Sequence, residues 1–193
     1  MKKFVAVILI LVVAVAAFAA GNSQYARAEE LYARGEYAQA AALYEQQGDY
    51  RDSAEKALEC RYLQADAAFA AEDYVSARDQ FAALGDYQDS ESRYALSRQA
   101  ILKQRVGTYQ LVSISNGEKT LTPMNTPLLQ DAQLVLNEYG GGSLVLGEAE
   151  SLVWDDTTII TGEGSSPYTV EGDTLTITVQ GSYVMVFSRL EEK

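Results

Sequence analysis

The chain of 193 residues contains no histidine, one cysteine and three prolines. Histidine is the side chain that most often serves as a general base or a metal ligand, and its absence also excludes a Ser-His-Asp triad. Cys60 has no second cysteine for an internal disulfide, and we expect it to pack as a small apolar residue. Basic residues are scarce as well, 15 against 27 acidic ones, which gives a formal net charge of −12 at pH 7. We therefore expect no binding to nucleic acid and no charge-driven binding to membranes.

The longest apolar run, residues 4–20, follows a short basic start at Lys2 and Lys3. Ala17-Phe18-Ala19 has the small-x-small pattern of a cleavage site, so residues 1–20 are predicted to be a signal peptide. The alternative is an uncleaved membrane anchor, which would be short for a bilayer. Both interpretations place the remaining chain outside the cytoplasm, with the membrane touched only through residues 4–20.

A sequence repeat follows the apolar run. Residues 48–53, with the sequence GDYRDS, return at 85–90 as GDYQDS, a spacing of 37 residues. A fixed period of this size is typical of stacked supersecondary units that bury their apolar faces against one another. The copies also match upstream, in the pairs Tyr25/Tyr62, Ala28/Ala65, Tyr32/Phe69, Tyr37/Tyr74, Ala40/Ala77 and Tyr44/Phe81.

The repeat region is predicted to be helical and to form a domain over residues 24–105. Asp52 with Glu55 three residues later has the spacing of a capping box, so a helix is expected to begin there. Gly48 is a natural helix stop. The expected helices are 24–34, 37–47, 53–71, 74–84 and 90–105.

These residues resemble the tetratricopeptide-type helical repeat. Ala28 and Ala65 resemble its small residue in the first helix, and Ala40 and Ala77 the small residue at the helix crossing. The proline near the end of that family's repeat is absent, and Glu72 stands where the first copy has Gly35. The resemblance implies binding of a peptide or protein of the cell envelope in a concave groove. The tyrosines predicted to be free for such a partner are Tyr25, Tyr32 and Tyr62.

The other large aromatic side chains of the repeats are expected to pack in the core, because aromatics at helical spacing are more often core than binding surface. They are Tyr37, Tyr44, Tyr74 and Phe81.

The pattern changes to strands after Arg105. Residues 174–179 (TLTITV) alternate with period two, and turn dipeptides separate short apolar runs. We expect an α+β chain whose second domain, 107–190, is an eight-stranded antiparallel meander barrel. The long connection 116–132 is expected to hold a short helix at 127–132 and to cover the barrel mouth. The predicted strands are 108–115, 133–137, 142–146, 151–154, 157–161, 167–170, 174–179 and 183–189. The side chains predicted to face the barrel interior are Trp154, Leu175, Ile177, Met185 and Phe187.

This half resembles the lipocalin-like domains of bacterial envelope proteins. The resemblance rests on the opening residues 107–111 (GTYQL), on 154–157 (WDDT) and on the closing 184–189 (VMVFSR). It implies a small barrel able to hold a hydrophobic molecule. Because the strands are short, we expect the interior to be filled by its own side chains, with a ligand cavity as the alternative.

The second half is the more acidic one. From Val106 onward there are 12 acidic residues against three basic ones, a net charge of −9. Asp155-Asp156 and the pair Glu148 and Glu150 could offer oxygen atoms to calcium, but neither has the spacing of a calcium loop. Asp155-Asp156 is expected first of all to be a turn.

We expect neither a cofactor nor catalytic or metal-binding residues. The sequence favours a non-catalytic extracytoplasmic protein whose helical repeats bind a peptide or protein partner. One alternative is a carrier that holds a small apolar ligand in the barrel under the 116–132 loop. Another is a hydrolase that uses a pair of acids, for which no motif singles out two carboxylates.

Overall fold

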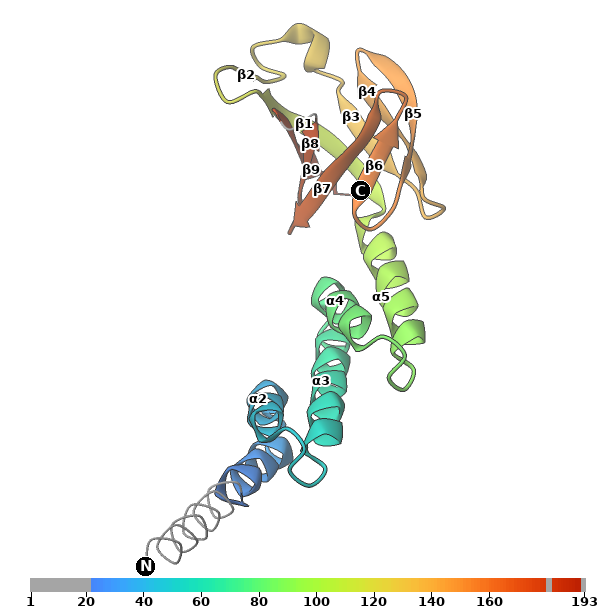
Figure 1. The fold of residues 1–193 in the computed structure, drawn as a ribbon. Coiled ribbons are helices and arrows are strands. Elements are labelled where there is room, and N and C mark those ends of the chain that lie inside the picture. The colour runs from blue at the N-terminus through green and yellow to red at the C-terminus, as the bar shows by residue number, and fades with distance from the viewer. Residues whose placement is uncertain (1–21, 180–181, 192–193) are drawn as a thin grey trace, which may run out of the picture. The chain divides into compact units, whose positions relative to one another are not determined.

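The computed structural model describes residues 22–179 and 182–191, which form five helices followed by a closed antiparallel barrel (Figure 1). The predicted α+β fold class is confirmed. The chain divides into two compact units, Met1–Ser97 and Arg98–Lys193, and this division falls within α5 (Ser90–Arg105). Within the described residues no helix is long and apolar enough to cross a membrane. The apolar run at 4–20 lies outside them.

The helices follow the sequence pattern closely. Residues 22–33 form the first, and α2 (Tyr37–Gln47), α3 (Ser53–Ala70), α4 (Tyr74–Leu84) and α5 come next. Two equivalent cores result, and alanines at the helix crossings allow close approach in both. The first contains Ala28, Ala40, Tyr44 and Cys60, and the second contains Ala65, Ala77 and Phe81. Tyr44 and Phe81 are fully buried, as predicted for core aromatics, whereas Tyr37 and Tyr74, predicted to be core as well, are only half-buried.

The duplication extends to the backbone. Gly35 and Glu72 occupy equivalent inter-helix turns, with φ of 74° and 61°. Arg51 and Gln88, also 37 residues apart, have φ of 55° and 53°. The second copy therefore keeps the left-handed turn although a glutamate has replaced the glycine.

The start of α3 differs from the prediction. Asp52 makes no side-chain capping bond to α3, so the expected capping box is wrong at this residue. Its carboxylate instead accepts a hydrogen bond from the Tyr25 hydroxyl at 2.5 Å. Ser53 is buried and its hydroxyl donates to the carbonyl of Tyr50, and Ser90 repeats this bond to Tyr87.

The barrel is a meander in which every main strand pairs with its neighbours in sequence. The sheet order is β2-β1-β3-β4-β5-β6-β7-β8-β9, and β1 also pairs with β9 and closes the barrel. The strands are β1 (Gly107–Ser115), β2 (Thr120–Leu121), β3 (Gln133–Leu136), β4 (Gly141–Leu146), β5 (Glu148–Trp154), β6 (Thr158–Thr161), β7 (Gly164–Glu171), β8 (Thr174–Val179) and β9 (Tyr183–Arg189).

Three details depart from the expected strands and short helix. β5 and β7 each begin three residues earlier than predicted, and the two-residue β2 adds to the edge of β1. The short helix η1 spans only Pro127–Leu129. Leu129 and Ala132 from this connection are buried in the barrel core.

Alternation along the strands decides which side chains fill the barrel. Tyr109 and Leu111 of β1 point into the core, and a bulge at Val112 then shifts the pairing with β9, so that Ile114 also packs inward.

On β4, a Cβ at Gly142 would lie 2.0 Å from the Val135 carbonyl oxygen, so this position requires glycine.

The barrel has two distinct ends. Residues 98–105 of α5 lead into β1 at the end we call the helix end, where β7 also turns into β8. At the opposite end, here the open end, β4 turns into β5 and β6 turns into β7. The 116–132 connection leaves β1 and enters β3 at the open end as well.

Candidate ligand-binding site at the open end of the barrel

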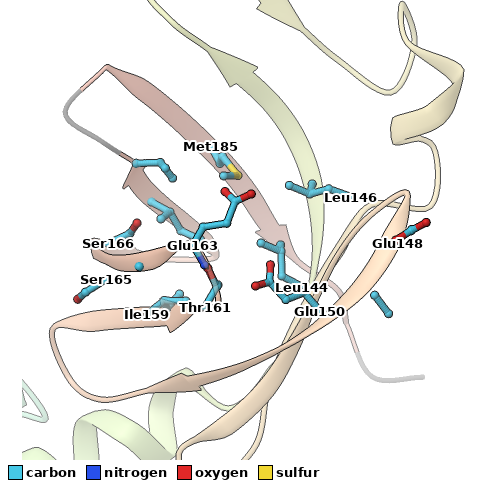
Figure 2. A pocket seen from close by; sticks show the side chains of 14 residues that line it. Leu144, Leu146, Glu148, Glu150, Ile159, Thr161, Glu163, Ser165, Ser166 and Met185 are labelled. Carbon is cyan, nitrogen blue, oxygen red and sulfur yellow. The ribbon is translucent and has the colours of Figure 1, made fainter.

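A cavity of about 680 Å³ occupies the open end of the barrel (Figure 2). Its apolar lining comes from alternate residues of strands that lie far apart in sequence. None of the described residues that line it belongs to the 116–132 connection. The lining residues are Leu144, Leu146, Glu148, Ala149, Glu150, Ile159, Thr161, Glu163, Gly164, Ser165, Ser166, Ile177, Val179 and Met185.

Strand register brings the apolar side chains together. Leu144 and Leu146 are two apart on β4, and Ile177 and Val179 are two apart on β8, so each pair faces the same side of its strand. Met185 of β9 lies directly opposite Ile177. The result is an apolar wall built from neighbouring strands around the opening.

Three carboxylates stand at the same opening. Glu148 and Glu150 belong to β5, and Glu163 lies in the turn between β6 and β7. Glu150 accepts a hydrogen bond from the backbone N–H of Gly162 at 2.6 Å, which holds its side chain across to that turn. In Figure 2 the side chain of Glu163 extends from the turn into the opening.

The predicted interior residues divide between the cavity and the core beneath it. Ile177 and Met185 line the cavity. Trp154, Leu175 and Phe187 are buried in the barrel core and do not appear among the cavity-lining residues. The barrel is therefore filled toward the helix end and hollow at the open end, a combination of the two alternatives that the sequence left open.

Polar contacts with the last residues of α5 close the helix end. The Arg105 guanidinium donates to the Asp156 carbonyl oxygen at 2.6 Å and to the Tyr168 hydroxyl at 2.9 Å. Arg98 donates to the Asp156 carboxylate at 2.8 Å, and that carboxylate is buried. Burial raises the pKa of Tyr168 to about 12 although Arg105 opposes the shift. Because these groups satisfy one another, the helix is anchored to the barrel floor.

Asp155 acts as a turn residue, as expected. Burial alone would raise the pKa of its carboxyl group, but hydrogen bonds from the N–H groups of Thr157 and Thr158 outweigh burial and lower the pKa. Asp156 points to Arg98. The described residues contain no group of three or more His, Cys, Asp or Glu side chains arranged to hold a metal ion.

The three candidate tyrosines of the helical repeats all donate to carboxylates 27 residues further along the chain. Tyr25 donates to Asp52 and Tyr62 to Asp89, each at 2.5 Å, and Tyr32 donates to Glu59 at 2.7 Å. The hydrogen bond to its carboxylate raises the pKa of Tyr25 and of Tyr32 to about 12 and raises the pKa of Tyr62. Each hydroxyl thus links the first helix of one hairpin to the next such helix or the residue just before it: residues 22–33 to α3, and α3 to the start of α5.

The charged groups beside these tyrosines repeat too. Lys56 lies 3.9 Å from Glu29 and 4.7 Å over the Tyr32 ring. Arg93, the equivalent of Lys56, pairs with Asp66 and lies 5.5 Å over the Phe69 ring. In both copies, therefore, a basic side chain pairs with an acidic one and lies over an aromatic ring.

Comparison with protein-family models, curated proteins and solved structures gives no match for this chain. The residues and their geometry are therefore the basis for assigning a function.

Some residues of the site escaped the sequence analysis. The sequence pattern suggests Glu148 and Glu150 only as calcium ligands and predicts no role for Glu163. A signal for Glu163 existed, because it stands in a Gly-Glu-Gly turn between two strands. The roles of Arg98 and Arg105 left no signal, because only the folded barrel brings Asp156 and Tyr168 to them.

Proposed function

We propose that this protein is a non-catalytic binding protein whose barrel takes up a small, largely apolar molecule at its open end. The observation that carries the proposal is the cavity of about 680 Å³ with its apolar wall. Ligand sites in proteins are concave and mostly apolar, carry a few placed polar groups, and measure roughly 300–1,000 Å³.

The construction of the barrel supports this role. Closure by the β1–β9 pairing joins the main strands into one ring, although β5 pairs with β6 only through Val153 and Trp154. Pairing between the strands therefore holds most of the cavity wall before a ligand arrives. Packing of Trp154, Leu175 and Phe187 beneath the cavity gives it a solid floor. We therefore expect a ligand to enter at the open end.

We also propose that the barrel is lipocalin-like, the helical array tetratricopeptide-like, and the protein extracytoplasmic. The meander order with first-to-last closure supports the first part. Paired helices with alanines at their crossings support the second. The basic start and the apolar run at 4–20 support the location, whether that segment is cleaved or remains as an anchor.

The test is binding of N-phenyl-1-naphthylamine, an uncharged fluorescent apolar probe. We expect saturable binding to one site per chain. Met185→Asp places a carboxylate on the half-buried cavity wall and should weaken binding at least tenfold. Val153→Asp is the matched control, because Val153 is 61% exposed on β5 and does not line the cavity.

Circular dichroism must show both variants folded. Absence of saturable binding to the wild-type chain, or equal binding by a folded Met185→Asp variant, would refute the carrier role.

A second candidate is that the helical array binds a protein partner. A groove of about 390 Å³, lined by Phe81, Ala82, Gly85, Glu91 and Tyr94, favours it. Repeats of this kind stack helix on helix, and arrays usually need at least three units. The occupant we propose is an amphipathic helix of an envelope protein, with Tyr25, Tyr32 and Tyr62 as further contact residues.

This candidate is tested by photo-crosslinking from position 94, followed by binding measurements with the purified crosslinked protein. Tyr94→Ala should weaken that binding, whereas Asp79→Ala, at an exposed position on α4, should not. Equal binding by both variants would remove the groove as a docking site.

A further inference from the structure

We propose that the ligand of the barrel cavity carries a positive charge on its apolar body, so that it is an organic cation such as a primary amine with a hydrocarbon or aromatic group. This inference rests on the proposed binding function and specifies the chemical class of its ligand. The site is the cavity itself, and the three carboxylates at its opening determine which charge it accepts.

The first step is the position of these carboxylates. Glu148, Glu150 and Glu163 all line the cavity. In Figure 2 Glu150 lies beside Leu144 and Glu163 extends toward Met185, whereas Glu148 lies at the tip of the β4–β5 hairpin. An apolar body seated against Leu144, Ile177 and Met185 would place a charged end group at the level of these acids. A cavity with apolar side chains inside and carboxylates at its opening is complementary to a ligand with an apolar body and a cationic end group.

The second step is that no described protein cation pairs with these carboxylates, although Lys119 lies in the 116–132 connection at the open end, outside the cavity lining. Among residues 22–179 and 182–191, no lysine or arginine forms an ion pair with any of these three glutamates. Arg189, one of the three basic residues after Val106, is held at the helix end by the carbonyl oxygens of Val106 and Gln104. The charge at the opening is therefore left for a ligand to neutralise.

The third step is that one carboxylate is already held in place. The N–H of Gly162 donates to one oxygen of Glu150, and a Cβ at Gly162 would lie 2.9 Å from that same oxygen. The glycine thus permits the close contact that fixes Glu150. A fixed carboxylate binds a cation without first losing side-chain freedom, which favours affinity.

The fourth step is the electrostatic field of the chain from Val106 onward. Its net charge of −9 from Val106 onward attracts cations and repels anions. Anionic apolar molecules such as fatty acids would meet repulsion at the opening. The charge distribution therefore discriminates among apolar ligands of equal size.

The experiment compares three probes that share one naphthalene body: 1-naphthylmethylammonium, 1-naphthylmethanol and 1-naphthylacetate. Titration calorimetry with the full chain should give the tightest binding for the ammonium and the weakest for the acetate. We expect the ammonium to bind about tenfold more tightly than the alcohol, equivalent to about 1.4 kcal/mol. Raising the salt concentration should reduce this preference.

The key variant is Glu150→Gln combined with Glu163→Gln. The glutamine oxygen at position 150 can still accept the Gly162 N–H, so the fold is preserved. The preference for ammonium over alcohol should fall to about twofold or less, while affinity for the alcohol stays unchanged. Glu138→Gln combined with Asp173→Asn is the matched control, because it removes the same number of charges from the exposed β3–β4 and β7–β8 turns at the helix end.

The outcomes separate the two proposals. Binding of the alcohol without preference for the ammonium, or a preference that survives the double variant, would overturn the cation inference and leave the carrier role intact. Binding of none of the three probes would overturn both.

Discussion

At the scale of single residues, the two repeats show how substitutions occur in matched pairs. Tyr32 donates to Glu59, and the equivalent positions in the second copy hold Phe69 and Leu96, so donor and acceptor are replaced together. Tyr44 donates to Glu29, whereas Phe81 donates nothing and Asp66 pairs with Arg93. At these positions neither copy leaves a polar group without a partner, which would cost more than the bond contributes.

Glu72 is the residue where the second copy retains backbone strain. A side chain in the left-handed region costs roughly 1–2 kcal/mol, and glycine avoids this cost while losing about 0.5–1 kcal/mol of chain entropy. Glu72→Gly should therefore raise the free energy of unfolding by about 0.5–1 kcal/mol, measured by urea denaturation. The reverse change, Gly35→Glu, should lower the free energy of unfolding by a similar amount. A destabilised Glu72→Gly variant would contradict this account.

Tyr25 predicts a particular dependence of stability on pH. Its pKa in the folded chain is about 12, above the ordinary value of 10.0, because Asp52 accepts its proton in a hydrogen bond. The stability it contributes is complete below pH 10 and is lost as the pH rises through about 12.

Removing the Tyr25 hydroxyl should therefore remove part of the alkaline loss. The difference in unfolding free energy between wild type and Tyr25→Phe should be constant from pH 7 to 9 and shrink toward pH 12. Tyr183→Phe, at an exposed position, is the control. A constant difference over the whole range would show that the hydrogen bond does not stabilise the protonated tyrosine.

At the scale of elements, α5 changes its role along its length. Its first half repeats the start of α3, as the paired serines Ser53 and Ser90 show. Its second half would begin a third repeat, but Arg98 and Arg105 instead bind the barrel residues Asp156 and Tyr168. The helix end of the barrel therefore depends on hydrogen bonds that α5 makes with Tyr168 of β7 and with Asp156 of the β5–β6 turn.

Tyr168 tests this dependence. Its buried hydroxyl donates to the Asp155 carbonyl oxygen at 2.7 Å and accepts from Arg105. Tyr168→Phe leaves both partners short of a bond and should cost about 1–3 kcal/mol of unfolding free energy. Tyr183→Phe should change it by less than about 0.5 kcal/mol. Probe binding at the open end should survive in the folded variant, and its loss would show that the two ends are coupled.

The elements themselves could largely be predicted from the sequence, because periodicity and turn residues are local signals. The bounds of α2, α4, β8 and β9 match those expected from the pattern. The cavity could not be predicted, since Leu144, Ile177 and Met185 meet only through the register of the closed sheet. The long starts of β5 and β7 were missed because glutamate, glycine and serine are poor strand signals, although these are the residues that form the opening.

At the scale of the whole molecule, the two units have separate cores. The barrel core includes Leu102 and Val106 at its margin, and the helical cores use residues before Ser97. The division at Ser97 and Arg98 therefore predicts which fragment can fold alone.

A fragment that begins at Arg98 should fold with a cooperative melting transition and a buried Trp154, as measured by fluorescence. A fragment that begins at Gly107 lacks Arg105 and Leu102, and its melting temperature should be lower by 10 °C or more, by the rough scale of 4–8 °C per kcal/mol for a domain of this size. Equal melting temperatures would show that α5 contributes nothing to the barrel.

The pairing of β1 with β9 also sets the order of events during synthesis on the ribosome. Tyr109 emerges 80 residues before its partner Arg189. The helices can form from local contacts while translation continues, whereas β1 must wait with one side unpaired until β9 has been made. A nascent chain stalled before residue 183 would therefore expose the unpaired edge of β1, which is prone to aggregation. We expect chaperones to bind such an intermediate.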